Sequence, residues 1–169
     1  MHARSILVAL SLGMMMAAGA RAADAPKAFE PLKKLAGTWQ GNAKMGPGQQ
    51  AMPVTIVYEL TAGGSAVLER LFPGTPHEMI SVYTADGDSV VMTHYCAMGN
   101  HPKMTLKRSD ANSLAFEMTG SEGLRSASEP HMHAVTVSWT DADHIREVWT
   151  SFDKGQAKDE KIFELVRKK

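Results

Sequence analysis

Leu-Ala-Gly-Thr-Trp-Gln-Gly, residues 35–41, marks a change of pattern from helical to extended. Before this stretch, the apolar residues of Phe29–Ala36 recur at helical spacing, and Pro31 suits the first turn of a helix. After it, short runs in which apolar and polar residues alternate are separated by turns rich in Gly, Pro, Asp and Asn. This order predicts one short helix followed by an antiparallel meander of strands, as found in sandwiches and barrels.

Ten such runs follow along the rest of the chain. We expect strands at Thr38–Met45, Pro53–Leu60, Ala66–Phe72, His77–Tyr83, Ser89–Met98, Lys103–Lys107, Ser113–Thr119, His131–Trp139, His144–Phe152 and Lys158–Arg167. Their connections are short, and Asp86-Gly87 is a strong hairpin signal. Because strands with short links pair with their neighbours, we expect an all-β fold: a single up-and-down antiparallel β-barrel, whose closure removes exposed strand edges.

The first expected strand opens with Gly37-Thr38-Trp39, which resembles the Gly-x-Trp entry motif of the calycin barrels: lipocalins, fatty-acid-binding proteins and nitrobindin-like proteins. The resemblance extends to the length and strand number of the chain after residue 22. It implies that Trp39 closes one end of the barrel and that a basic residue of the last strand, Arg167, stacks on it through a cation–π contact. Gly37, Trp39 and Arg167 are therefore the expected structural residues.

More narrowly, the chain resembles a bacterial family of exported lipocalin-like proteins. The features that carry this resemblance are the Gly-x-Trp start, the His-Tyr-Cys-x-x-Gly-Asn segment at 94–100 and a Trp-Thr pair near the end. One departure concerns the barrel mouth, because no segment of this sequence suits the helical pair that covers the mouth of fatty-acid-binding proteins.

Residues 1–22 have the organisation of a cleavable secretory signal peptide. Arg4 supplies the positive charge, Ile6–Ala18 is an apolar run of 13 residues, and Ala20-Arg21-Ala22 places small residues at the cleavage positions. The apolar run is shorter than the ~20 residues that span a bilayer, so we expect no stable membrane insertion. We expect cleavage before Ala23, a barrel domain at 23–169 and a periplasmic or secreted location.

The composition excludes several classes of protein. With 44% apolar residues and 18 basic against 18 acidic side chains, the chain is too apolar and too little charged for a disordered protein. The balanced charge also argues against a nucleic-acid partner, which needs a basic excess. The single cysteine, Cys96, excludes an intramolecular disulfide. The expected partner is a small-molecule ligand, and the oligomeric state stays open.

Segment 92–104 is dense in metal-binding side chains, with Met, His or Cys at six of its 13 positions. The period of a strand places Met92, His94, Cys96 and Met98 on one face. Thioether, imidazole and thiolate groups suit Cu(I), and imidazole with thiolate also suits Zn. The alternative is that the sulfur side chains are core packing and that His94 is a hydrogen-bonded histidine of the barrel.

His131 and His133 form a second group, because alternate strand positions share a face. The other face of this strand is mostly small and polar, so we expect the two histidines to point into the lumen. If His94 and Cys96 also point inward, four donors converge there and give a metal site for Zn or Cu. The resemblance to nitrobindin-like barrels adds haem as a possible cofactor, held by one histidine: His131, His133 or His144.

Several charged residues interrupt the apolar strands, namely Glu69, Arg70, Glu78, Arg146, Glu147 and Arg167. In fatty-acid-binding barrels, inward arginines bind a carboxylate through paired hydrogen bonds, so the resemblance makes Arg146 and Glu147 candidate ligand-binding residues. The alternation around them does not settle which one faces inward. The alternative is that these residues form solvent-facing ion pairs between neighbouring strands.

Three functions fit these patterns. The leading hypothesis is an exported small-ligand-binding barrel, whose apolar or amphipathic ligand would contact His94, His131, His133, Arg146 and Glu147. The second is a metal- or haem-binding protein that uses the His94/Cys96 and His131/His133 pairs. The third is a lumen acid–base enzyme, which would need an imidazole–carboxylate pair, such as His133 with Glu147 or Glu69.

Overall fold

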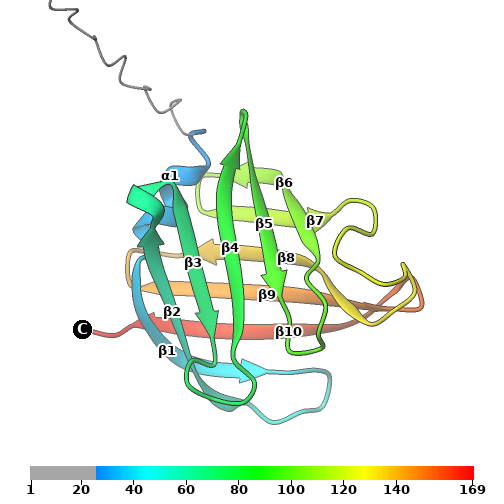
Figure 1. Ribbon diagram of the computed structural model, residues 1–169. Coiled ribbons are helices and arrows are strands. Elements are labelled where there is room, and N and C mark those ends of the chain that lie inside the picture. Colours follow the sequence, from blue (N-terminus) through cyan, green and yellow to red (C-terminus); the bar gives the residue numbers. More distant parts are fainter. Residues whose placement is uncertain (1–25) are drawn as a thin grey trace, which may run out of the picture.

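The computed structural model describes residues 26–169, and the expected signal peptide lies outside the described residues. The elements in chain order are α1 (Phe29–Lys34), β1 (Gly37–Lys44), β2 (Met52–Thr61), the 3-10 turn η1 (Ala62–Gly64), β3 (Ala66–Leu71), β4 (Met79–Asp86), β5 (Ser89–Tyr95), β6 (Lys103–Asp110), β7 (Ser113–Met118), β8 (His131–Trp139), β9 (His144–Asp153) and β10 (Gln156–Arg167). Each strand pairs antiparallel with the next, and β1 also pairs with β10, so the sheet closes into a barrel (Figure 1). The prediction of a single up-and-down barrel of ten strands with a short N-terminal helix is confirmed.

The lumen of the barrel is the core of the protein. Successive residues of a strand face opposite sides of the sheet. In β9, Glu147 and Trp149 are therefore buried, whereas Arg146, which directly precedes Glu147, is exposed. Many of the largest fully buried side chains are aromatic: Trp39, Trp149, Tyr58, Tyr83, Phe29, Phe116 and Phe163. Side chains therefore fill much of the space that the closed sheet encloses.

The seam between β1 and β10 depends on close backbone packing at Gly41. This residue lies opposite Leu165 in register, and a Cβ added to Gly41 would overlap the carbonyl oxygen of Glu164. Any larger residue would therefore push the two strands apart where the barrel closes. Gly41 is the last residue of the stretch in which the sequence changes from helical to extended.

Arg167 ties the end of β10 to the start of the barrel. Its guanidinium carbon lies 4.2 Å from the centre of the Trp39 ring, the cation–π contact that the calycin resemblance implied. Gly37, with a φ of +136°, gives this guanidinium room, since an added Cβ would lie 2.8 Å from Arg167 Nη1. The guanidinium also donates to three backbone carbonyls, at 2.7–3.0 Å: those of Lys34, Ala36 and Ala142. One side chain thus joins β10 to α1, β1 and the β8–β9 turn.

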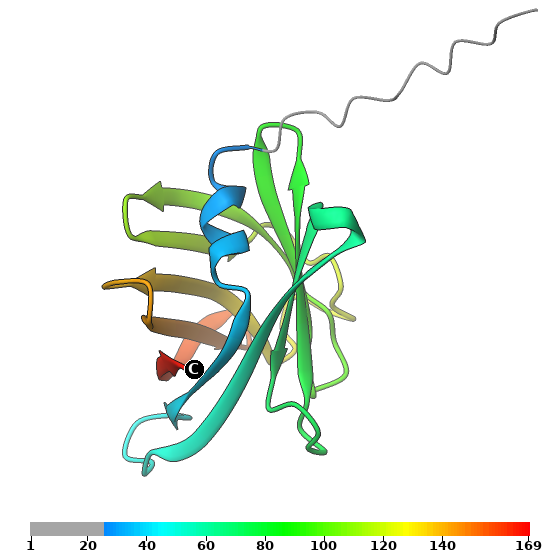
Figure 2. The same cartoon turned by 90° about the vertical axis from the view of Figure 1, so that its left-hand side faces the viewer.

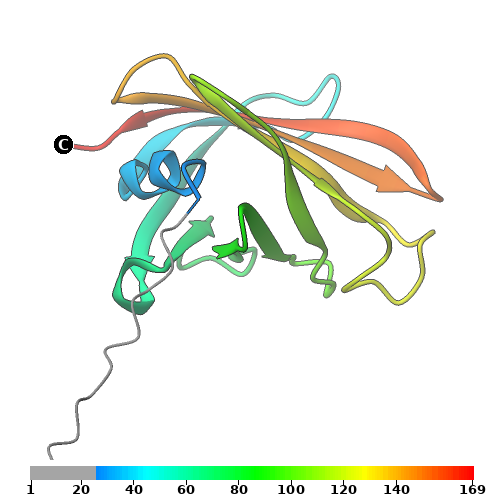
Figure 3. The same ribbon diagram turned by 90° about the horizontal axis from the view of Figure 1, so that it is seen from above.

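α1 covers the end of the barrel at which β1 begins (Figures 2 and 3). Phe29 and Leu32 are fully buried in the core, and the indole of Trp39 donates a hydrogen bond to the Leu35 carbonyl at 2.8 Å. The helix therefore fills this end with apolar side chains. Within residues 26–169, no helix is long and apolar enough to cross a membrane.

The strand β5 ends earlier than the sequence predicted, at Tyr95 instead of Met98. The backbone turns at Cys96, whose amide donates to the Asn100 carbonyl and whose carbonyl accepts from Gly99, both at 2.9 Å. Gly99 has a φ of +80°, which a glycine adopts without strain. Met98 therefore lies on the turn and is exposed, not on the face of β5 that carries His94.

Replacing Gly41 with alanine tests the seam. We expect Gly41→Ala to lower the free energy of unfolding by about 3 kcal/mol or more, because the new methyl group overlaps backbone that cannot move without opening the β1–β10 pairing. Gly48→Ala is the matched control: Gly48 has no neighbour within 4 Å and a φ of +72°, so the cost should be about 1 kcal/mol. Urea unfolding followed by tryptophan fluorescence measures both, and equal costs would contradict the importance of the seam.

Candidate functional site

A row of four polar side chains follows the inner wall of the barrel from β2 to β5. Tyr58, Glu69, Ser81 and His94 lie directly opposite one another in the register of consecutive strands, and all four are buried. Each occupies an inward position in the alternation of its strand. Since a buried polar group is costly unless it is hydrogen-bonded, the partners of this polar row decide its chemistry.

Glu147 on β9 meets the polar row and forms a carboxyl pair with Glu69. The Tyr58 hydroxyl oxygen bridges the two, at 2.7 Å from Glu147 Oε1 and 3.2 Å from Glu69 Oε1. Tyr83 donates to Glu69 Oε2 at 2.9 Å, and the Trp149 indole donates to Glu147 Oε2 at 3.0 Å. All four carboxyl oxygens therefore have a partner, although neither glutamate reaches solvent.

The carboxyl pair holds its protons unequally. Burial raises the pKa of Glu69 well above its usual range, and the negative charge of Glu147 raises it further. Burial also raises the pKa of Glu147, but hydrogen bonds from Trp149 and Tyr58 act against this. The Tyr58 hydroxyl has one hydrogen, and the shorter of its two distances is the one to Glu147. Glu69 is thus the member of the pair that holds a proton more tightly.

His94 ends the polar row with one nitrogen that has no partner. Its ring packs against Trp149 with 4.6 Å between the ring centres. Its Nδ1 lies 3.0 Å from Ser81 Oγ, whereas its Nε2 is buried without a hydrogen bond. Burial lowers the pKa of His94 to about 4, so the imidazole is neutral at neutral pH.

The hydrogen bond between Ser81 and His94 is compatible with either His94 nitrogen carrying the hydrogen, since a hydroxyl both donates and accepts. In the tautomer with the hydrogen on Nδ1, the Ser81 oxygen accepts it. Nε2 then has a free lone pair, the form in which an imidazole accepts a hydrogen bond or binds a metal ion.

His94 lines a small chamber at the end of the barrel where β1 and β3 finish, away from α1. The other side chains around this mouth chamber are mostly apolar or sulfur-containing: Met45, Leu71, Met79, Met132, Trp149, Lys161 and Phe163. Its volume is about 10 Å³, which is room for about one water molecule. The Lys161 ammonium is engaged elsewhere, 3.3 Å from Ser151 Oγ and 3.6 Å from the Asp159 carboxylate.

His131, although buried, and His133 pack on Phe152, on the outer face of β9, so the expectation that they point into the lumen is wrong. A β-bulge shifts the register of β8 against β9 by one residue between Met132 and Ala134. Met132 is thereby placed inward, where it lines the mouth chamber. His133 stacks on Phe152 at 3.7 Å between ring centres, and His131 Nε2 lies 3.2 Å from His133 Nδ1.

The four donors expected to form one metal site do not converge. Cys96 begins the turn after β5, and its Sγ lies 3.9 Å from the Met79 sulfur. Burial raises the pKa of the Cys96 thiol, so the thiol is protonated at neutral pH. In the part of the chain that the structure describes, no three His, Cys, Asp or Glu side chains are placed to hold a metal ion together. The His94/Cys96 and His131/His133 pairs therefore belong to separate places.

The other candidate residues divide between the two faces of β9. Glu147 faces the lumen, whereas Arg146 is exposed and has no place in a lumen site. His144, a candidate haem ligand, is exposed at the strand start and lies 2.9 Å from Asp141. His133 lies 3.8 Å from Glu117 and does not form the imidazole–carboxylate pair expected of a lumen enzyme.

Sequence reasoning missed the tyrosines and the serine of this site. Tyr58 and Tyr83 alternate with apolar inward residues, so they look like packing side chains. One signal could have found them: Glu69 lies at an inward position between Val67 and Leu71, both buried. A carboxyl group at such a position needs donors from neighbouring strands, and tyrosine hydroxyls at inward positions are the donors that an aromatic lumen offers.

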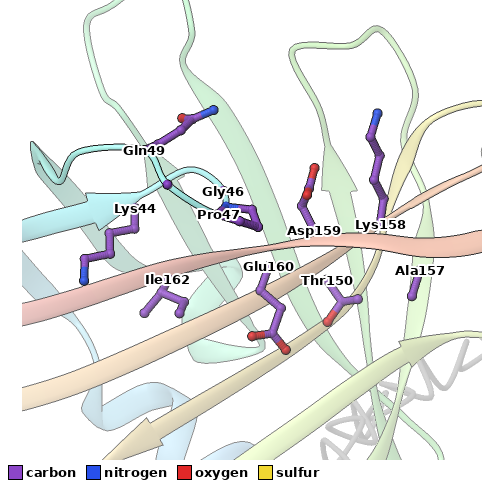
Figure 4. Close-up of a pocket in the computed structure, with 11 residues that line it drawn as sticks. Lys44, Gly46, Pro47, Gln49, Thr150, Ala157, Lys158, Asp159, Glu160 and Ile162 are labelled. Carbon is purple, nitrogen blue, oxygen red and sulfur yellow. The ribbon is translucent and has the colours of Figure 1, made fainter.

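A larger hollow, of about 680 Å³, lies outside the barrel, between the β1–β2 loop and the strands β9 and β10 (Figure 4). Its polar lining residues include Lys44, Lys158, Asp159 and Glu160. In Figure 4 the side chain of Glu160 points to one side of β10 and those of Lys158 and Asp159 point to the other. Because these polar groups do not converge, we assign no site to this hollow.

Comparison with known proteins supports the fold alone. No protein-family model matches the chain, and no curated protein matches it. Among solved structures, a protein of unknown function from the DUF3598 family of Nostoc punctiforme superposes with a TM-score of 0.55 at 15% sequence identity. The match covers 81% of this chain and 49% of that one, so the present chain spans about half the length of this structural neighbour.

Two conservative substitutions test where the proton of the carboxyl pair resides. Glu69→Gln mimics a protonated glutamate, so it should keep the hydrogen bonds and remove the titration. Glu147→Gln offers one oxygen to two donors, Tyr58 and Trp149, and should cost about 1–3 kcal/mol at every pH.

The pH dependence follows from the sign of the Glu69 shift. The unfolded chain loses the Glu69 proton at its usual pKa, near 4.5, while the folded protein keeps it to higher pH. Wild-type stability therefore falls as the pH rises from about 5 to 8. Glu69→Gln should lack this pH dependence, so its stability relative to the wild type should increase as the pH rises. Urea unfolding at pH 5, 6.5 and 8 measures these free energies. If Glu147→Gln left the free energy of unfolding unchanged and Glu69→Gln lowered it, the proton would reside on Glu147 and the assignment would be wrong.

Proposed function

We propose that this protein is an exported, calycin-like barrel that binds a small ligand in its mouth chamber, with His94 as the polar anchor. The observation that carries the proposal is His94 Nε2, a buried nitrogen without a hydrogen-bond partner on a residue that lines the chamber. A buried polar atom left unpaired costs about 1–3 kcal/mol. A ligand that donates a hydrogen bond to Nε2, or binds its lone pair, removes this cost.

The calycin-like assignment is supported by three features that occur together. The barrel is closed by ten antiparallel strands, and a short helix precedes the first strand. The Gly-x-Trp motif places Trp39 under the guanidinium of Arg167. In calycin barrels the lumen holds the ligand, which agrees with the position of His94.

The charges around the mouth chamber favour a neutral or cationic ligand over an anion. His94 is neutral, and the Lys161 ammonium is paired with the Asp159 carboxylate. An anion would therefore find no free positive charge. Methionine side chains are unbranched and flexible, so those around the chamber can rotate to admit the apolar part of an amphipathic molecule.

Phenol is a suitable organic probe of this site, because it is small, neutral at pH 7 and carries one hydroxyl donor for Nε2. With ¹³C-labelled methionine methyl groups, we expect a saturable phenol-induced shift of the Met45, Met79 and Met132 signals. Met104, which is buried on β6 and is not among the residues that line the chamber, is the internal control.

His94→Phe is the matched variant, since it keeps a ring against Trp149 and removes the lone pair. We expect it to abolish the shifts while leaving the Met104 signal in place, which also shows that the variant is folded. Shifts that are spread over all methionines, or that persist in His94→Phe, would contradict binding at His94.

Export is tested at the N-terminus. When the full chain is expressed in a Gram-negative host, we expect the protein in the periplasmic fraction with Ala23 as its first residue. Ala22→Arg places a large charged residue at the cleavage position and should block processing. Protein that stays in the cytoplasm with Met1 intact would contradict export.

A further inference from the structure

We propose that the ligand of the mouth chamber is a soft monovalent metal ion, Cu(I), held by His94 Nε2 and the thioether sulfurs of Met79 and Met132. This inference rests on the proposed function, since it names the ligand class for the same chamber. The donor set differs from the one that the sequence suggested, because His131 and His133 take no part in it.

The size of the chamber is the first argument. Its volume of about 10 Å³ fits one water molecule or one ion, whereas an organic ligand needs side chains to move. Three methionines and one histidine share the wall of this small space. A single ion is therefore the occupant that the chamber admits with the least rearrangement.

The chemistry of the wall is the second argument. Cu(I) prefers thioether and imidazole ligands, whereas Mg²⁺, Ca²⁺ and Mn²⁺ prefer oxygen. The chamber offers the sulfurs of Met45, Met79 and Met132, while the Asp159 carboxylate is paired with Lys161. With neutral donors only, a singly charged soft ion is favoured over a hard divalent one.

The polar row is the third argument, because it prepares His94 as a ligand. A metal-binding imidazole usually donates the hydrogen of its other nitrogen to a fixed acceptor, which sets the tautomer and the ring orientation. Ser81 Oγ lies 3.0 Å from His94 Nδ1 and is placed to accept this hydrogen. In that tautomer the lone pair of Nε2, which has no partner in the protein, is free to bind a metal ion.

The surroundings also favour a cation at this place. The Trp149 ring lies beside His94 and lines the chamber, and the face of an indole attracts positive charge. Lys161, which also lines the chamber, directs its own charge to Ser151 and Asp159.

Cu(I) binding is measured by competition with the chromophoric chelator bathocuproine disulfonate, under nitrogen and with ascorbate as reductant. For the protein purified without other chelators, we expect one Cu(I) per chain. Met79→Leu combined with Met132→Leu keeps the volume of both side chains and removes both sulfurs, so the affinity should fall about tenfold or more. Met104→Leu, the same change at a buried position elsewhere in the lumen, should leave the affinity unchanged within about twofold.

Two further variants separate the proposed site from other copper-binding groups. Ser81→Ala removes the hydrogen-bond partner of His94 Nδ1 and should lower the Cu(I) affinity about 10-fold to 100-fold. Cys96→Ser removes the thiol next to Met79 and should leave the affinity unchanged. Binding that is lost in Cys96→Ser but kept in the double methionine variant would show a thiol site and overturn the proposal.

The phenol experiment distinguishes failure of this inference from failure of the proposed function. If the protein takes no Cu(I) from the chelator but phenol shifts Met45, Met79 and Met132, the inference is wrong and the ligand-binding chamber stands. If neither binds, both are wrong. If Cu(I) shifts the Met79 and Met132 signals and phenol does not, the chamber is an ion site and not an organic-ligand site.

Discussion

Closure of the barrel between β1 and β10 is the constraint on which the other features of this protein depend. The two strands approach so closely that Gly41 has no room for a side chain beside the Glu164 carbonyl. Arg167 then holds the end of β10 against Trp39 and three backbone carbonyls. With the sheet closed, each strand has one face in the lumen and one in solvent, and the polar residues on the inner faces have to find partners there.

The polar row and the carboxyl pair are the consequence of that requirement. Glu69 and Glu147 come from strands on different sides of the barrel, and neither reaches solvent. Tyr58, Tyr83 and Trp149 supply donors for both, and unequal protonation removes the repulsion that two charged carboxylates would have. The polar row then leads, through Ser81, to a histidine nitrogen that the protein itself leaves unpaired.

The two ends of the barrel differ in how they are filled. At the α1 end, the buried side chains of Phe29, Leu32 and Trp39 pack together, and the Trp39 indole has a hydrogen-bond partner. At the other end, flexible methionines surround His94 and leave a small chamber. The end that lacks a helical cover is therefore the end at which a buried polar atom, His94 Nε2, has no hydrogen-bond partner.

By itself, the sequence determined where the strands and the short helix lie, because periods of two and of about 3.6 residues are local properties of the chain. It also determined the contact between Trp39 and Arg167, through a motif and its position in the last strand. The tertiary structure alone decided which residues form the site. One extra residue in β8 turned His131 and His133 outward and Met132 inward, and nothing in the alternation of that strand marks the bulge. Glu69 and Glu147 meet only because the sheet closes, since residues 78 positions apart carry no local signal of their contact. Periodicity assigns a residue to a face of its strand, but register and closure decide which residues share that space.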